Sequence, residues 1–527
     1  MTSTYEALQQ ELLEKDIVFT ISARALTPIF IGGYDGRCKH PGGLGFEGLR
    51  EPSIKGVWRW WARALIAAAI RKAEGVYIDI ETADSIVSRI LGGSSRRSHE
   101  KVSSKYTIIV SKISTNDYTS IEDYGDNPRV KLIHMGSEGK ERRRRLEPDY
   151  VIKPGTNITI TVLRNRSTRQ VEDKFALWSL VLSLILDGVG KITSRGFGKL
   201  KITKVEGDNT SELDSILQEL YSSQTVNAVK ENLKKLIDKA IEKAQNFIAG
   251  VNEEEIIRCA KRYEKPLMEI PLISEELMML GIPSKTFTTT KQALLVIGNA
   301  SLKMYHKMLL LLRRKEKEKE KVHDVNQVRR EAQRISGKDA HTWILGLPRS
   351  QEPAIVHNGK EKEREIRKKL SRELRSRFEN YEKLVKKVKE VEIRGQRRIR
   401  IPTGYYYLGV NKEELELRRR SPIRFTLIEA HGSKYFVVIY GFKVFDLENI
   451  LNGLVHVGVH YERKREGRRV KVINVKRFDV TSITDILRKE GKSLESMIVD
   501  IINSVKELIE KSIVEGTRRA RSGRPGR

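Results

Sequence analysis

The order of strand-like and helix-like patterns in the first two fifths of the sequence constrains the fold more than any other feature. Alternating or β-rich patterns predict strands at residues 16–26, 105–113, 157–165 and 199–207. Apolar helical periodicity predicts helices at residues 53–75 and 171–190, with Ser53 as N-cap and Gly75 as the stop of the first. Strand, helix, two strands, helix, strand is the order of a split βαβ domain, so we expect an α+β fold of ferredoxin-like (RRM-like, βαββαβ) type.

The rest of the chain divides by composition. Residues 1–206 form the predicted N-terminal domain, and residues 207–262 are predicted as a helical connecting segment because apolar residues recur there at three- and four-residue steps. A second domain is predicted at residues 263–515, with strands, helical insertions and a hairpin that turns at Gly432 and Ser433. The basic tail at residues 516–527 has almost no apolar content, so we expect it to be disordered.

The charge balance points to a polyanionic partner. The chain of 527 residues holds 99 Lys and Arg against 69 Asp and Glu, a formal net charge of +30. Nucleic acid and acidic lipid surfaces both attract such a charge, but the longest apolar runs fall short of the about 20 residues of a membrane span. The amino terminus shows no secretory signal, which favours the cytoplasm, and Cys38 and Cys259 are too far apart in sequence for a disulfide framework or a thiolate metal site.

A glycine-rich loop follows the second predicted helix. Four glycines fall within residues 188–198, where bare backbone permits positive φ and close approach to a phosphate. Substitution of Gly196 or Gly198 by valine is then expected to damage binding more than folding. The alternative is that the glycines only turn a helix sharply into a strand. The pattern is neither a Walker A nor a Rossmann motif, so no nucleotide cofactor is expected. The candidate RNA-binding residues of the loop are Gly188, Gly190, Lys191, Ser194, Arg195, Gly196, Phe197, Gly198 and Lys199.

The first predicted helix carries a second basic feature. Its cations recur every four residues and form one stripe, while Trp58 belongs to the apolar core face. Trp60 and Trp61 cannot both share that face, so at least one indole is expected at the edge, where it would stack on an unpaired base. The absence of a side chain at Gly56 lets a ribose approach the start of the helix. The candidate RNA-binding residues of this helix are Lys55, Gly56, Arg59, Trp60, Trp61 and Arg63.

Several of these stretches together resemble a known family. The segments "TPIFIGGYDG", "LREPSIKGVWRWWARAL", "DGVGKITSRGFGKL", "WILGLPRS" and "RRRSPIRFTLI" are similar to the RAMP superfamily and, more closely, to the family of the first-numbered subunit of type III-B (Cmr) CRISPR effector complexes. The resemblance implies two tandem ferredoxin-like RAMP domains. It also implies a non-catalytic subunit that binds CRISPR guide RNA and target RNA near the 3′ end of the guide, beside other subunits of the complex. The second domain has no equally good glycine-rich loop, which leaves its RNA role open.

Two other functions stay open on the sequence. A metal-independent RAMP endoribonuclease needs a general base near the 2′-hydroxyl, and His40 in the entry loop is the candidate. A purely structural assembly subunit would share the fold without energetic RNA contacts. His456 and His460 lie on one predicted strand face without an acidic or cysteine partner, so no metal site is expected.

Overall fold

The chain forms two compact units that interleave in sequence. The computed structural model describes residues 16–32, 48–94, 101–130, 150–250, 278–318, 354–357, 360–376, 381–393, 396–402, 404–408, 423–442, 454–466, 469–482 and 494–511, with 40, 41, 43, 46, 262, 263, 327 and 328. Residues 1–335, 423–443 and 502–527 belong to the first unit, and residues 336–422 and 444–501 to the second. Each unit combines segments that are distant in sequence, so the units differ in kind from the predicted domains. The predicted domain boundaries stay a prediction. Cys38, Cys259 and the tail predicted to be disordered at 516–527 lie outside the described residues.

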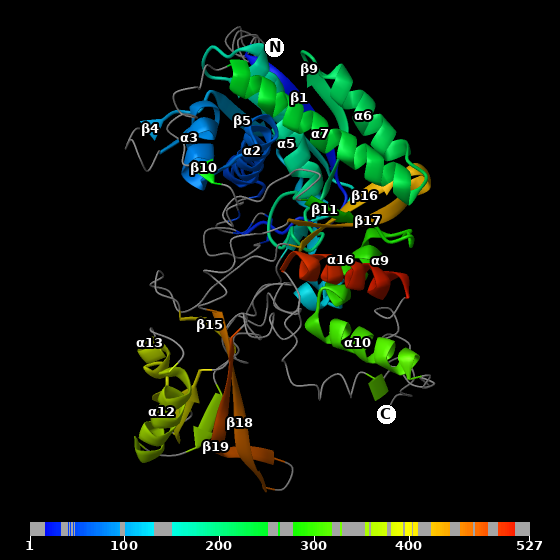
Figure 1. Ribbon diagram of the computed structural model, residues 1–527. Coiled ribbons are helices and arrows are strands. Elements are labelled where there is room, and N and C mark those ends of the chain that lie inside the picture. Colours follow the sequence, from blue (N-terminus) through cyan, green and yellow to red (C-terminus); the bar gives the residue numbers. More distant parts are fainter. Residues whose placement is uncertain are drawn as a thin grey trace. The chain divides into compact units, whose positions relative to one another are not determined.

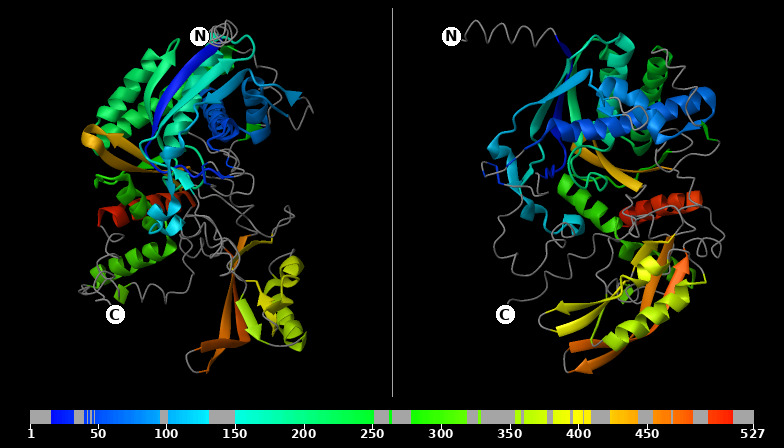
Figure 2. Two further views of the ribbon diagram at one scale, coloured as in Figure 1. Left: turned by 180° about the vertical axis from the view of Figure 1, so that it is seen from behind. Right: turned by 90° about the vertical axis from the view of Figure 1, so that its left-hand side faces the viewer.

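The first unit is built on a four-stranded antiparallel sheet (Figures 1 and 2). Its strands lie in the order β5-β8-β1-β9, and each neighbouring pair is antiparallel. Along the chain the elements are β1 (Ile17–Ala25), α2 (Glu51–Glu74), β5 (Tyr106–Val110), β8 (Asn157–Arg164), α5 (Gln170–Leu186) and β9 (Leu200–Gly207). The predicted strands and helices of this region are therefore present in the predicted order, except that the second helix ends at Leu186 and not at residue 190.

The ends of α2 show how local sequence sets the elements. Gly75 adopts φ 74° and donates its N–H to the carbonyl of Arg71, which confirms the predicted stop. The prediction of Ser53 as N-cap is wrong, because the helix begins two residues earlier, at Glu51, with Arg50 as N-cap. Pro52 occupies the first turn, where its missing N–H leaves no intrahelical bond unmade.

Helices cover one face of this sheet, and two of them come from the predicted connecting segment. The segment forms α6 (Ser211–Ser222) and α7 (Val226–Gly250), and α7 lies alongside α5 and α2 (Figure 1). The apolar face of α7 is buried against them and consists of Val229, Leu233, Leu236, Ile237, Ala240, Ile241, Ala244 and Phe247. The segment predicted as a connector is thus part of the core of the first unit.

Short elements between the main strands were not predicted from the sequence. They include α3 (Ile80–Leu91), which packs on α2. The others are β2 (Tyr77–Ile78), β3 (Gly93–Ser94), β4 (Lys101–Val102), η1 (Thr115–Asp117), β6 (Tyr118–Ser120), η2 (Ile121–Tyr124) and β7 (Tyr150–Ile152). A further short strand, β10 (Arg262–Tyr263), follows the main strands and pairs with β2. Two- and three-residue strands are too short for a period-2 pattern to show.

A second sheet of the first unit comes from the later part of the chain. It has the order β11-β17-β16 and comprises β11 (Met278–Gly281), β16 (Ile423–Ala430) and β17 (Lys434–Phe442), accompanied by α9 (Thr290–Ala300), α10 (Lys303–Lys317) and α16 (Leu494–Glu510). The predicted hairpin turn is confirmed, with Gly432 at φ 72° and Ser433 at φ 56°. Glu429 of β16 accepts a hydrogen bond from Arg24 of β1 at 2.8 Å and lies 3.2 Å from Lys201 of β9.

The second unit has two three-stranded sheets and its own core. Its strands are β12 (Ala354–His357), β13 (Lys389–Ile393), β14 (Gln396–Ile401), β15 (Gly404–Tyr407), β18 (Leu454–Glu466) and β19 (Arg469–Ser482), and its helices are α12 (Lys360–Leu374) and α13 (Tyr381–Val385). The sheet orders are β12-β14-β13 and β15-β18-β19. The sequence block at 360–390 has the charge pattern of one basic helix, but α12 ends at Leu374, the short helix α13 follows, and β13 begins at Lys389. Across the described residues, no helix is long and apolar enough to cross a membrane.

Candidate nucleic-acid interface

The glycine-rich loop closes on its own backbone. The N–H of Val189 donates to the carbonyl of Gly198 at 2.9 Å, and Gly188 and Gly198 adopt φ of 73° and 67°. A Cβ on Gly198 would lie 1.9 Å from the Val189 oxygen, and one on Gly188 would lie 2.1 Å from the Gly198 oxygen. These two glycines are therefore needed for the loop to close. For this pair, the geometry supports the alternative that the glycines serve to turn a helix sharply into a strand.

The loop also pairs with the entry loop that follows β1. Lys191 donates its N–H to the carbonyl of Phe30 at 2.8 Å, and Gly198 donates to Pro28 at 2.9 Å. A Cβ on Gly190 would lie 2.5 Å from the Phe30 oxygen. These backbone amides, which the sequence assigns to a phosphate cradle, thus donate their hydrogen bonds to carbonyls of the protein. Contact with an anion at this loop therefore depends on side chains.

Lys199 stabilises the end of a helix from inside the core. Its Nζ donates to the carbonyls of Leu186 and Asp187 at 2.6 and 2.7 Å, and its side chain is fully buried. Burial, with a smaller contribution from the nearby Arg424, lowers the pKa of Lys199 to about 7, while the charge of Asp187 opposes the shift. The residue therefore binds the C-terminal carbonyls of α5.

This depressed pKa predicts a pH dependence of stability. Above about pH 7 the folded protein releases the Lys199 proton, whereas the unfolded chain keeps it up to the ordinary pKa of 10.5, so the contribution of Lys199 to stability rises with pH within this window. Between pH 7.5 and 8.5, wild type is expected to gain about 1 kcal/mol relative to Lys199→Met in chemical unfolding. A difference between the two proteins that stays constant with pH would contradict the assignment.

Ser194 and Arg195 attach the loop to β16. Arg195 donates from Nη1 to the carbonyl of Ile423 at 2.8 Å, and the N–H of Phe425 donates to the carbonyl of Ser194 at 3.2 Å. The Arg195 side chain is buried, and this burial, with Arg129 and Arg424 close by, lowers its pKa. Its guanidinium therefore holds two protein segments together.

The basic stripe of α2 is mostly neutralised by α3. Asp84 lies 2.9 Å from Arg63 and 3.9 Å from Arg59. Lys55 is half-buried, and its pKa is lowered by burial and by the charge of Arg59. No acid is paired with Lys55 within the described residues. Among the described residues, Lys55 is therefore the stripe cation without an acidic partner.

The three tryptophans of α2 differ in exposure. Trp58 is buried as predicted and donates from Nε1 to Ser179 Oγ at 2.8 Å. Trp61 is also fully buried, so its ring is not exposed for stacking. Trp60 is partly exposed, and the Arg424 guanidinium lies over it at 4.2 Å from the ring centre. As expected, one tryptophan of the pair remains at the edge.

Arg424 joins α2 to the glycine-rich loop. Besides covering Trp60, it forms a buried ion pair with Asp187 at 2.7 Å. Tyr440, on the neighbouring strand β17, donates its hydroxyl to the carbonyl of Leu186 at 2.9 Å. Trp60 of α2 and the end of α5, where the glycine-rich loop begins, therefore meet at the β16–β17 hairpin. Sequence reasoning missed the role of Arg424, although it lies in the quoted segment "RRRSPIRFTLI".

Phe197 is the remaining predicted loop residue with a ring. It is fully buried and packs edge-on against Phe30, with ring centres 5.0 Å apart. It therefore fixes the loop to the entry loop.

The candidate general base of the endoribonuclease hypothesis has an aromatic neighbour. His40 is exposed, and its ring lies edge-on to that of Tyr150 at 4.6 Å between centres. His460 of the second unit lies 3.9 Å from Asp479, an acid that the sequence did not place beside it. No group of three metal-ligating side chains is found within the described residues.

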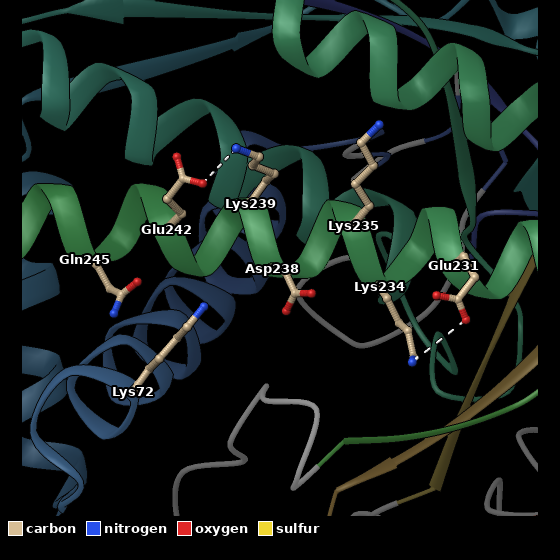
Figure 3. Close-up of a pocket in the computed structure, with 8 residues that line it drawn as sticks. All are labelled: Lys72, Glu231, Lys234, Lys235, Asp238, Lys239, Glu242 and Gln245. Atoms are coloured by element: carbon tan, nitrogen blue, oxygen red, sulfur yellow. Dashed lines mark hydrogen bonds and ion pairs between the residues drawn. The ribbon is translucent and has the colours of Figure 1, made fainter.

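A cavity of about 370 Å³ lies between the end of α2 and α7 (Figure 3). Its lining alternates in charge and comprises Lys72, Glu231, Lys234, Lys235, Asp238, Lys239, Glu242 and Gln245. Lys239 and Glu242 form an ion pair at 2.8 Å, and Lys234 lies 3.8 Å from Glu231. Because acids offset its cations, this cavity is a poor site for a polyanion.

One family model and two curated relatives each match part of this chain. Residues 22–201 match the model of the RAMP superfamily. The CRISPR system Cmr subunit Cmr1-1 of Pyrococcus furiosus is 26% identical over 41% of this chain and 56% of that protein. The CRISPR system CMR subunit Cmr1 of Saccharolobus solfataricus is 22% identical over 36% of this chain and 56% of that protein. The match thus spans little more than half the length of each curated relative.

Solved structures show more distant likenesses. A chain in the cryo-EM structure of the type III-B Cmr-beta bound to cognate target RNA has a TM-score of 0.49 and 16% identity, covering 82% of this chain and 97% of that one. The crystal structure of Cmr1 from Pyrococcus furiosus in its apo form has a TM-score of 0.39 and 14% identity, covering 90% of this chain and 96% of that one.

Proposed function

We propose that this chain, which belongs to the RAMP superfamily through residues 22–201, is a non-catalytic RNA-binding subunit of a type III-B CRISPR (Cmr) effector complex. It holds guide RNA and target RNA near the 3′ end of the guide and contacts other Cmr subunits, in the cytoplasm. The names of its relatives support the complex, and the net charge of +30 supports a polyanionic partner.

The observation that carries the RNA role is the meeting of α2 and the glycine-rich loop at Arg424. Trp60 lies at this junction and is partly exposed, Lys55 and Gly56 precede it by about one turn of α2, and a side chain on Gly56 would meet nothing within 4 Å. In our proposal these residues and Lys191 contact the ribose-phosphate strand. The remaining predicted residues act by holding the junction in place: Arg59, Trp61, Arg63, Gly188, Gly190, Ser194, Arg195, Gly196, Phe197, Gly198 and Lys199.

Replacement of Lys55 tests this assignment. Lys55→Gln is expected to weaken binding of single-stranded RNA by about 1 kcal/mol and to reduce the log-log salt slope by about 0.7, the value of one phosphate contact. Lys72→Gln is the matched control, because Lys72 lies on the same helix in the cavity of mixed charge. Equal effects of the two variants in fluorescence anisotropy would refute the site. Wild-type affinity that does not change with salt would favour the assembly role alone.

We also propose a second ferredoxin-like domain that completes a tandem. Its sheet order β11-β17-β16 corresponds to three of the four strands of the first sheet, and α9 and α16 follow β11 and β17 along the chain. The second unit then consists of two insertions, one before β16 and one that begins after β17 and ends within α16, at residue 501. In this arrangement the predicted domain at 263–515 is one continuous region of the chain that contains both the second sheet and the two insertions.

The second candidate function is a metal-independent endoribonuclease. The contact between His40 and Tyr150 favours it, because imidazole and phenol groups both serve as general acids or bases. In that case, repeat RNA is cleaved in the presence of chelator and His40→Ala abolishes cleavage. We expect no cleavage by wild type in this gel assay, and cleavage that depends on His40 would replace our first proposal.

A further inference from the structure

Helix α12 of the second unit carries a line of exposed cations. Arg364, Lys368 and Arg372 of the helix, and Arg375 directly after its last residue, are all exposed, and they follow one another at steps of four, four and three residues. Such steps place side chains on one face of a helix, with about 6 Å of rise for each four-residue step. We call these four residues the α12 stripe.

Two neighbouring cations of α12 are engaged within the protein. Arg367 pairs with Glu363 at 2.7 Å and donates to the carbonyl of Val388, and Lys369 pairs with Glu365 at 2.6 Å. The four residues of the α12 stripe, in contrast, have no acidic partner in the described part of the chain. Their positive charge is therefore not offset locally.

The opposite face of α12 is already buried in the second unit. Ile366, Leu370 and Leu374 belong to its hydrophobic core, and the helix packs on β19 (Figures 1 and 2). Because this apolar face is occupied, α12 cannot insert it into a lipid surface. The α12 stripe has no exposed apolar or aromatic residue either, and so it lacks the desolvated core of a protein interface.

We propose that the α12 stripe is a sequence-independent docking surface for the phosphate backbone of single-stranded RNA. A linear row of cations, one per turn, matches a polymer with regularly spaced charges. Lysine and arginine supply the phosphate contacts, and the lack of aromatic residues predicts that no base stacks on the stripe. The inference rests on the proposed function only in taking RNA as the polyanion. The predicted domain at 263–515 lacks a good glycine-rich loop, so the sequence left its RNA role open. The α12 stripe lies within that domain and gives it an RNA contact.

The first unit offers a matched control. Lys235 and Lys239 of α7 are also one turn apart, but Lys235 pairs with Glu219 at 2.7 Å and Lys239 with Glu242 at 2.8 Å. Together with Lys72 they line the cavity of mixed charge (Figure 3). A variant lacking these three cations has the same net charge as one lacking three residues of the α12 stripe, and differs from it only in where the charge is removed.

The experiment compares the full-length triple variants Arg364→Gln/Lys368→Gln/Arg372→Gln and Lys72→Gln/Lys235→Gln/Lys239→Gln. Glutamine keeps helix propensity, and circular dichroism verifies that each variant is folded. Binding of labelled oligouridine is measured over a salt series. The α12 variant is expected to bind about tenfold more weakly and to lose about 2 from the log-log salt slope, as for three lost phosphate contacts, while the control keeps both values.

Equal changes in the two triple variants, or none in either, would overturn the α12 proposal. Lys55→Gln in the same assay reports separately on the site of the first unit, so the two proposals fail independently. If the α12 variant lost binding to phosphatidylserine vesicles but kept its binding to oligouridine, the α12 proposal would also be overturned, in favour of a lipid surface. Wild type that binds no oligouridine at all would remove the proposed function and the α12 inference together.

Discussion

Gly198→Ala is expected to lower the free energy of unfolding by about 3 kcal/mol or more. At φ 67° an L-residue costs about 1 to 2 kcal/mol, because its Cβ crowds the backbone. Here the new Cβ also meets the Val189 oxygen at 1.9 Å, so the loop must open and lose the Val189–Gly198 hydrogen bond, at about 1 to 3 kcal/mol more. Chemical unfolding measured by fluorescence of the buried tryptophans reports the loss.

Gly56→Ala is the control for this effect. Gly56 lies within α2, and a Cβ there has nothing within 4 Å, so alanine is expected to stabilise the helix by about 0.5 to 1 kcal/mol. Equal stabilities of wild type and Gly198→Ala would show that the loop does not close as described. From the sequence, valine at position 196 or 198 is expected to damage binding more than folding. From the structure we expect the greater damage to folding, because a Cβ on Gly196 would also crowd Ile297 at 3.0 Å.

Asp187→Ala is expected to cost about 3 to 5 kcal/mol, because it leaves a buried arginine without its counter-charge. Asp187 lies 2.7 Å from Arg424, accepts a hydrogen bond from the Thr193 hydroxyl at 3.1 Å, and is close to the buried Lys199. Removal of this carboxylate thus leaves Arg424 and Lys199 facing each other in the core. The measurement is the shift of the unfolding midpoint in denaturant.

The double variant Asp187→Ala/Arg424→Met provides the test of that cause. If the uncompensated charge is what destabilises the single variant, the double variant recovers a large part of the loss. Additive losses from the two substitutions would mean that packing, and not charge, dominates at this junction.

Local patterning was sufficient to predict the first sheet. Strands β1 and β8 alternate apolar and polar residues, and α5 is an apolar run with acidic residues in its first turn, so periodicity alone specifies them. The turn at Gly432 was predictable for the same reason, since it separates two β-rich runs.

The site was less predictable, because charge in a sequence does not reveal burial. Lys199 and Arg195 looked like phosphate ligands, yet both are buried and bind backbone carbonyls. The Asp187–Arg424 pair joins residues 237 positions apart, and no local pattern links them. The sequence did single out both elements, α2 and the glycine-rich loop, and Arg424 contacts Trp60 of the one and Asp187 at the start of the other.

The most direct measurement of the central claim is photo-cross-linking of the assembled ribonucleoprotein with 4-thiouridine in the guide and target RNA, followed by mass spectrometry. The account predicts cross-links in the peptides that contain Lys55 to Trp60 and Lys191, at the junction held by Arg424. Cross-links confined to peptides outside residues 17–207 would contradict it.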